Sequence, residues 1–270
     1  MDELAAVGLA TRGFLTTTEL LRHVDRPGLD RLVRRGELVR VRAGVYVDGA
    51  RFMSGEPVAR HVMAARAVAG LLGEGYAVSH LSAVALHGLP VLRSDLGRIH
   101  LSLLRPGKPR ADERLQVHAT LPASAVVDVR GTAVVTTAVG VVQAAASAGV
   151  RAGIVAADTA MRSGVTHDQL ATALDIGRLG RGRRVAARVV ELADGRSESP
   201  GESWARLVMA EVGLPTPELQ GLVRDESGAI VARVDFLFRA ERVVVEFDGA
   251  VKYGGPAAQG QLALVAEKRR

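Results

Sequence analysis

The sequence of 270 residues predicts an α+β protein of several domains. Signals for three helices and a β-hairpin fill the first 50 residues, helix and strand patterns mix over 56–175, and a helix with two alternating strands follows residue 199. We therefore expect a winged helix-turn-helix at 1–50, an α/β middle domain at 56–175, a basic linker helix at 176–198 and a further α/β domain at 199–270.

The composition indicates a folded, basic protein. Hydrophobic residues make up 48% and aromatic residues 3%, so the cores must consist mainly of Ala, Val and Leu. The net charge is +6, and all but three of the 35 basic residues are Arg, which is partly explained by a GC-rich codon usage. The chain has no cysteine, which excludes disulfides and zinc–thiolate sites and fits a cytoplasmic location.

Two segments could mark a secreted or membrane protein, but the composition of each argues against it. The start, MDELAAVGLATRG, has acids instead of the basic region of a signal peptide. Residues 131–150 carry no charge and are long enough to span a bilayer, but they include threonines and glycines. We interpret them as a buried strand followed by an Ala-rich helix.

Local signals define the elements of the first 50 residues. The second helix is expected to begin at TTTE (16–19), a capping-box pattern. The third helix should begin at Pro27 and end at Gly36. Strands are expected at 37–42 and 45–48, joined by a turn at Ala43-Gly44.

The third helix and the hairpin place arginines on one side. Leu29, Leu32 and Val33 share the helix face that is expected to be buried. Residues 26–42 contain six Arg against two acids, and a basic helix beside a basic hairpin suits a DNA groove and its flanking phosphates. The alternative is a solvated face of an interaction module. The candidate DNA-contacting residues are Arg31, Arg34, Arg35, Arg40 and Arg42.

The middle domain shows a helix at 57–72, a strand near 98–104, strands within 115–135 and helices near 138–148 and 150–163. The stretch SHLSAVALHGLP (79–90) contains His80 and His87, seven residues apart. No carboxylate or third histidine lies at a metal-ligand spacing nearby, so both are interpreted as capping or core residues.

A helix and two strands are expected in the C-terminal domain. Ser199 and Glu202 form a capping-box pattern at the start of the helix, and strands follow at 229–238 and 242–248. The apolar face of the helix should consist of Trp204, Leu207, Val208 and Val212.

The two strands carry opposed acids. A symmetric hairpin places Asp235 directly opposite Glu246, where two carboxylates should repel each other. A bound Mg²⁺ (or Mn²⁺) would offset that repulsion.

The same hairpin has a second interpretation. Arg233 would face Asp248, and their ion pair could neutralise a polar, solvated sheet face. In that case Glu202 is simply a helix cap.

Several motifs resemble known families. The order Glu202, RVDF (233–236) and VVVEFDG (243–249) resembles the very-short-patch-repair-like endonuclease domain of the PD-(D/E)XK superfamily. TTTELL, the Arg-rich helix, LVRVRAGVYV (38–47) and SHLSAVALHGLP resemble the AbiEi-type antitoxin winged helix and its following domain. Together the two resemblances cover nearly the whole chain.

The resemblance implies roles for the C-terminal residues. Asp235 and Glu246 would bind the metal, Glu202 would be the acid of the first helix, and Asp248 occupies the position where the superfamily often has its lysine. Lys252 or Lys268 would supply the missing positive charge. This set would hold Mg²⁺ or Mn²⁺, activate a water and attack a phosphodiester.

The chain also departs from these families. Relatives continue beyond EKRR (267–270) through a helix and at least one more strand, so we expect an incomplete restriction-endonuclease-like domain with an exposed apolar face. Relatives often carry an Arg and an Asp where this chain has Val139 and Gln143. The residues of the expected apolar face are Phe236, Val245 and Phe247.

Three functions fit these observations. One is a metal-dependent DNA endonuclease targeted by the winged helix. The second is a repressor or antitoxin-like regulator with a degenerate nuclease domain, acting as a homodimer or with a toxin partner. The third is an Ala-rich interaction scaffold, which predicts no salt-dependent affinity for DNA.

Overall fold

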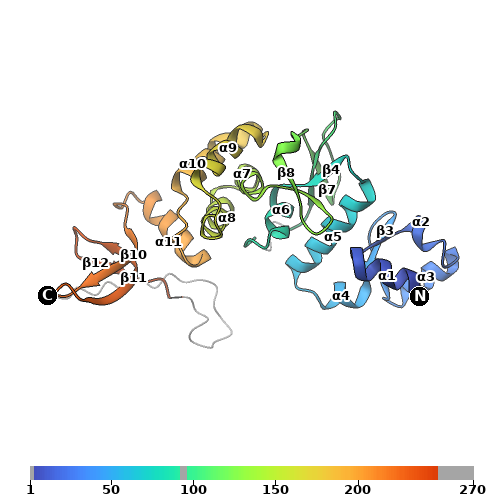
Figure 1. Ribbon diagram of the computed structural model, residues 1–270, viewed down its shortest axis with the longest axis horizontal. Coiled ribbons are helices and arrows are strands. Elements are labelled where there is room, and N and C mark those ends of the chain that lie inside the picture. Colours follow the sequence, from blue (N-terminus) through green and yellow to red (C-terminus); the bar gives the residue numbers. More distant parts are fainter. Residues whose placement is uncertain (1–2, 92–95, 249–270) are drawn as a thin grey trace.

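The protein is a mixed α/β chain with three sheets among the residues that the computed structural model describes, 3–91 and 96–248. The strand orders are β1-β3-β2, β6-β7-β5-β4-β9-β8 and β10-β11-β12. The sheets follow one another along the long axis of the molecule, with the N-terminal part at one end and the third sheet at the other (Figure 1). The predicted α+β class is confirmed at this level.

The N-terminal part consists of short helices and a small sheet. The Thr16 side chain and the Glu19 carboxylate form the expected capping box, and Asp25 caps the third helix through Gly28 N. The elements are α1 (Glu3–Arg12), β1 (Leu15–Thr16), α2 (Thr17–Leu20), α3 (Arg26–Arg34), β2 (Leu38–Arg42) and β3 (Val45–Asp48).

Strand β3 joins the N-terminal part to the middle of the molecule. Because side chains alternate along a strand, its neighbours face opposite ways. Tyr46 packs with the leucines of the N-terminal core, whereas Val45 and Val47 belong to the central core. The hairpin therefore takes part in two cores at once.

The middle region has a six-stranded mixed sheet covered by helices. Strands β4 and β5 are antiparallel, while β4–β9 and β5–β7 are parallel. Helix α5 packs against β4 and β5, and α6 packs against β5 and β9. The elements are α4 (Gly49–Ser54), α5 (Pro57–Leu72), β4 (Tyr76–Val78), α6 (His80–Leu86), β5 (Ile99–Leu103), β6 (Arg110–Ala111), β7 (Leu115–His118), β8 (Val126–Asp128) and β9 (Ala133–Val135).

Helix α7 (Thr137–Ala148) lies at the centre of a helical layer and contacts α6, α8 (Val150–Arg162), α9 (His167–Ile176) and α10 (Arg183–Leu192). The uncharged stretch 131–150 is thus strand β9 and this buried helix, as expected. No helix among the described residues is long and apolar enough to cross a membrane. Helix α10, within the expected basic linker, buries its apolar face in the central core.

The C-terminal part combines α11 (Pro200–Glu211) with strands β10 (Glu218–Arg224), β11 (Ile230–Phe238) and β12 (Val243–Val245). The register of the last hairpin pairs Phe236 with Val245, as the sequence predicts.

Two expectations in this part are wrong: the residues assigned to the buried face of the helix, and the exposed apolar face assigned to the sheet. Trp204 and Val212 were expected on the buried face of α11, but they are 38% and 67% exposed. Ala205 and Met209 are buried there instead, against Phe236. Because α11 covers this side of the sheet, Phe236 is fully buried, while Val245 and Phe247 are partly buried.

A buried ion pair joins α8 to α11. The Arg206 guanidinium donates to both oxygens of Asp158, at 2.8 and 2.6 Å, and the two side chains are 10% and 0% exposed. Asp158 also accepts from Asp194 N at 2.8 Å, and Arg206 donates to Leu192 O. The carboxylate therefore anchors both α11 and the segment that precedes it.

Removing one partner leaves a buried charge without compensation, so Arg206→Met should lower the free energy of unfolding by about 3–5 kcal/mol. Urea unfolding can be followed by Trp204 fluorescence. This single tryptophan lies on α11 and donates to Arg151 O on α8. Glu191→Gln, which breaks the exposed Arg188 pair, should cost less than about 1 kcal/mol.

The double variant Asp158→Leu/Arg206→Met replaces both charges by apolar groups. It should recover much of the stability that the single variant loses. Equal destabilisation by Arg206→Met and by Glu191→Gln would show that the pair does not hold α11 in place.

Candidate functional site

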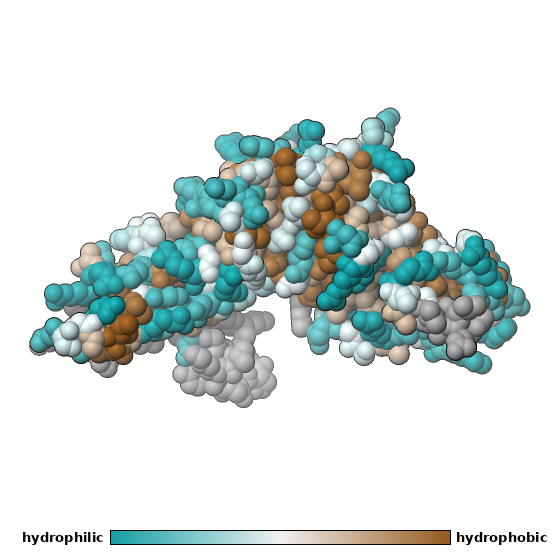
Figure 2. Space-filling model, in the orientation of Figure 1, coloured by the Kyte–Doolittle hydropathy of each residue, from teal (hydrophilic) through white to brown (hydrophobic). Residues whose placement is uncertain are grey.

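Four of the five predicted DNA-contacting arginines have exposed side chains at the N-terminal end of the molecule. Leu29 and Leu32 are buried, so α3 turns its arginines outward. Hydrophilic side chains dominate this end of the visible face (Figure 2). We call the exposed set the basic surface; it comprises Arg31 and Arg34 on α3, Arg35 at the C-cap of α3 and Arg40 on β2.

The ion pairs within the basic surface are long and solvated. Arg31 lies 3.8 Å from Asp25, and Arg35 lies 3.9 Å from Glu37. Exposed pairs of this kind contribute little stability because water and salt screen them. Both guanidinium groups can therefore exchange these partners for a stronger anion such as a phosphate.

Arg42 differs from the other four predicted contacts. Its guanidinium lies 2.6 Å from the Asp112 carboxylate, between β6 and β7 of the middle region. The hydrogen bond from Arg42 holds the pKa of that carboxyl well below its usual range. Arg42 thus ties the hairpin to the middle region in this structure.

In the C-terminal part, Gln220 links two of the predicted catalytic acids. Its side-chain amide donates to Glu202 at 3.1 Å and to Asp235 at 3.4 Å. Glu202 is buried and also accepts from Glu198 N and the Ser199 hydroxyl, which completes a helix cap. Glu202 therefore has a clear structural role.

The remaining predicted acids are arranged differently from expectation. The ladder of β11 and β12 ends at Val245, and Asp235 accepts from Phe247 N at 2.8 Å. Glu246 is exposed and Asp248 is half-buried. The expected pair of Arg233 with Asp248 is wrong, because Arg233 donates to Glu198 at 2.9 Å. Lys252 and Lys268 lie outside the described residues.

The structure also brings together a set of histidines that the sequence interpretation missed. His80, His100 and His118 have one ligand nitrogen each within 4.8 Å of the others. Among the described residues this is the only group of three His or acidic side chains so placed, so the C-terminal acids form no such group. Along the sequence no third histidine lies at a metal-ligand spacing from His80, but the fold brings His100 and His118 to it from other elements.

The three histidines come from three elements. Ser79 N donates to His100 O, which places the start of α6 beside β5. Ser102 on β5 pairs with His118 on the parallel strand β7. No sequence spacing reveals this set, because strand pairing and not local periodicity brings its members together. His87 lies apart, with its Nε2 2.7 Å from Val135 O.

The three imidazoles are neutral at neutral pH. Burial lowers the pKa of His100 to about 3 and that of His118 to about 4, and it places the pKa of His80 well below the ordinary value. One ring nitrogen of His100, Nδ1, lies 2.9 Å from His118 Nε2. A hydrogen bond at that distance requires that only one of these two nitrogens carries a proton.

The side chain of Gln143 on α7 binds the backbone of the histidine set at His80. Its Oε1 accepts from His80 N at 3.2 Å, and its Nε2 donates to Gly177 O at 3.0 Å. His80 has a positive φ of 52°, which is uncommon for a residue with a side chain. The amide of Gln143 therefore satisfies two buried backbone groups and fixes His80 in this conformation.

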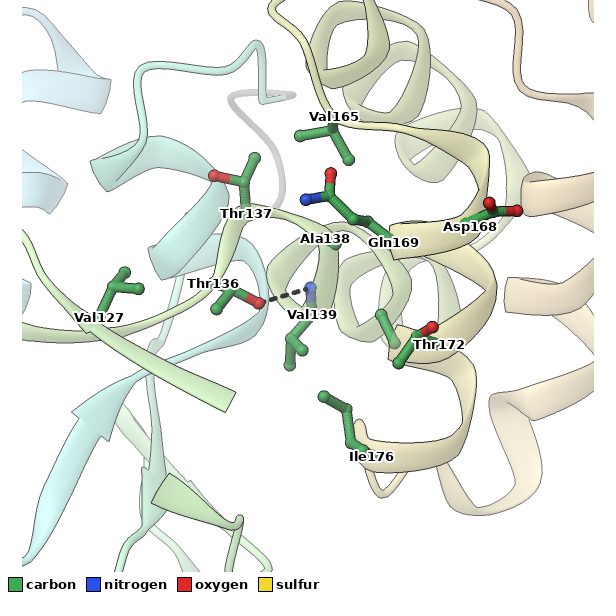
Figure 3. A pocket seen from close by; sticks show the side chains of 11 residues that line it. Val127, Thr136, Thr137, Ala138, Val139, Val165, Asp168, Gln169, Thr172 and Ile176 are labelled. Atoms are coloured by element: carbon green, nitrogen blue, oxygen red, sulfur yellow. Dashed lines mark hydrogen bonds between the residues drawn. The ribbon is translucent and has the colours of Figure 1, made fainter. Parts of the chain in front are cut away.

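A separate cavity of about 450 Å³ lies between the start of α7 and α9 (Figure 3). Thr136, which caps α7 through Val139 N, and Thr137 face Val165 and Gln169 across it. The lining is mostly apolar, with Asp168 as its charged residue. It contains none of the predicted site residues.

Relatives of this chain occur in mycobacteria. Over 238 residues it is 34% identical to "Uncharacterized protein MT2308" of Mycobacterium tuberculosis strain CDC 1551 / Oshkosh, covering 87% of this chain and 82% of the relative. The same values hold for "Uncharacterized protein Rv2248" of strain ATCC 25618 / H37Rv. The chain belongs to the family of these two proteins. No family model matches it.

Neither relative's name gives an activity. The aligned length extends over most of the chain. The structure offers two chemically distinct features that bear on function, the basic surface and the histidine set.

Substitution Gln143→Leu should leave His80 N and Gly177 O unsatisfied in the interior. Each such group costs about 1–3 kcal/mol, so the free energy of unfolding should fall by about 2–4 kcal/mol. Urea unfolding followed by far-UV circular dichroism measures this decrease. Gln116→Leu, at a half-buried position of β7, is the control and should change stability by less than about 1 kcal/mol. Similar destabilisation by both substitutions would contradict the bridging role of Gln143.

Proposed function

We propose that this protein is a DNA-binding regulator whose residues 1–50 form a winged helix-turn-helix. Helix α3 would be the recognition helix, and the β2–β3 hairpin would be the wing. The observation that carries the proposal is the basic surface: α3 buries its leucines and exposes Arg31 and Arg34. Arg35 at its C-cap and Arg40 on the hairpin extend the charge.

The chemistry of the basic surface suits a nucleic acid. Guanidinium groups bind phosphates and guanine edges in a bidentate manner. The hydrogen bond between Arg42 and Asp112 fixes the hairpin relative to the middle region. A wing held in this way would meet the DNA backbone in a defined position while α3 enters the major groove.

The arrangement of the C-terminal acids favours a regulator over an endonuclease. Both oxygens of Asp235 accept hydrogen bonds from within the chain, one from Gln220 and one from Phe247 N. Glu202 serves as a helix cap. A repressor or antitoxin-like protein, acting as a homodimer or with a toxin partner in the cytoplasm, needs only the basic surface and not a metal-loaded acid cluster.

Arg34→Ala should weaken binding to a labelled DNA duplex and make it less sensitive to salt. Removing one arginine–phosphate ion pair should reduce the slope of log affinity against log salt by about 0.9. Fluorescence anisotropy over a salt series measures both quantities, and replacing all four arginines of the basic surface should abolish binding. Arg224→Ala removes the same charge from the C-terminal sheet and should leave the slope unchanged. A wild-type protein without salt-dependent affinity would contradict the proposal.

A plasmid-nicking assay distinguishes the proposed regulator from an endonuclease. The wild-type protein and Glu246→Gln are incubated with supercoiled plasmid, with and without Mg²⁺ or Mn²⁺. A pure regulator nicks under neither condition and binds DNA equally well in both forms. Metal-dependent nicking that Glu246→Gln removes would overturn the regulator proposal and establish an endonuclease with Mg²⁺ or Mn²⁺ as its cofactor.

A further inference from the structure

The histidine set of the middle region has the composition of a transition-metal site. Imidazole nitrogen is a favoured ligand of Zn²⁺, Co²⁺, Ni²⁺ and Cu²⁺, whereas Mg²⁺ and Ca²⁺ prefer oxygen. Three protein ligands with a fourth, exchangeable water is the arrangement of open zinc sites. We propose that His80, His100 and His118 bind one zinc-type ion with a water as fourth ligand.

The separation of the ligand nitrogens, and not the stacking of the rings, supports this assignment. The ring centroids of His80 and His118 lie 3.5 Å apart, and those of His100 and His118 lie 5.2 Å apart. Ligand nitrogens around a tetrahedral Zn²⁺ are about 3.3 Å from each other, as Zn–N bonds of about 2.0–2.1 Å require. The 2.9 Å contact between His100 Nδ1 and His118 Nε2 therefore needs to open by less than about 0.5 Å when the ion replaces the shared proton.

The stacked rings of His80 and His118 must also turn so that their nitrogens converge. The torsion about the Cβ–Cγ bond of a histidine is soft, so the ring can turn without moving the backbone. The backbone positions are already fixed. Gln143 holds His80 N, and the Ser82 hydroxyl accepts from His100 N at 2.9 Å.

Hydroxyl groups surround the three rings. Ser79 Oγ lies 3.0 Å from Nδ1 of His80, which leaves Nε2 as the free ligand atom of that ring. Such outer partners orient metal-binding histidines and fix their tautomers. Ser82 Oγ lies 2.8 Å from Nε2 of His61, so a further histidine supports the same network.

An independent observation comes from Ser102. Its side chain is fully buried, and its Oγ has no hydrogen-bond partner among the described residues. Ser102 pairs with His118 in the register of β5 and β7, so the two side chains leave the sheet on the same face. A buried hydroxyl without a partner requires an explanation, and a water bound to the ion beside His118 would supply its partner.

Metal binding would connect three elements that are distant in sequence. His80 begins α6, His100 lies in β5 and His118 ends β7. An ion held by all three would fasten the helix to the sheet and would make the stability of the middle region depend on the metal. This inference does not depend on the DNA-binding proposal, because none of these residues belongs to the basic surface.

The test uses full-length protein without a histidine tag, stripped with a chelator and then titrated with Co²⁺. We expect one equivalent to produce the visible absorption of tetrahedral cobalt, Zn²⁺ to displace it, and Mg²⁺ to have no effect. Zn²⁺ should also raise the midpoint of thermal unfolding. A wild-type protein that shows neither stoichiometric absorption nor a Zn²⁺-dependent midpoint would overturn the site.

Variants locate the ion. His100→Gln and His118→Gln should each weaken Co²⁺ binding by more than about 100-fold, and Ser79→Ala by about 10- to 100-fold as an outer partner. His87→Gln is the matched control. His87 directly follows α6, and its Nε2 contacts Val135 O and not the other histidines, so this variant should bind Co²⁺ as the wild type does. Binding that survives His118→Gln but fails in His87→Gln would overturn the assignment. Wild-type titration decides the existence of the site even if a variant does not fold.

Discussion

The burial of α7 is the constraint on which the rest of the structure depends. This helix is packed against α6, α8, α9 and α10, so a continuous run of its residues, from Ala138 to Ala145, is excluded from water. Small side chains make this close packing possible: Gly153 of α8 lies so near Ala145 that a Cβ there would clash. A chain with few aromatic residues can therefore fill its core with closely spaced helices.

Gln143, the polar side chain buried deepest in α7, connects this helix to the histidine set through a hydrogen bond. Gln143 is 1% exposed and bridges the backbone of His80 to that of Gly177. Buried amides are tolerated only when their hydrogen bonds are satisfied, and here both are. The position where related sequences were expected to differ thus has a definite role: it holds the first residue of α6 in an unusual backbone conformation.

Ionic contacts connect the ends of the molecule to this centre. Asp158 and Arg206 join α8 to α11 in the interior, and Arg42 and Asp112 join the N-terminal hairpin to the middle region at the surface. The buried pair holds α11 to α8, and the hairpin is held to the middle region mainly by Val45 and Val47, which pack in the central core.

The sequence alone determined the positions of most elements, because these depend on local signals. Helix α5 and strand β3 have the predicted bounds, Thr16 caps α2, and the last hairpin pairs Phe236 with Val245. Capping, periodicity and turn chemistry act over a few residues and can be read directly.

Only the tertiary structure decided which distant side chains meet. The histidine set, the bridge made by Gln220 and the partner of Arg233 join residues from separate elements, and their contacts depend on strand order and helix packing. Sheet order placed His100 beside His118, and no spacing in the sequence encodes that neighbourhood.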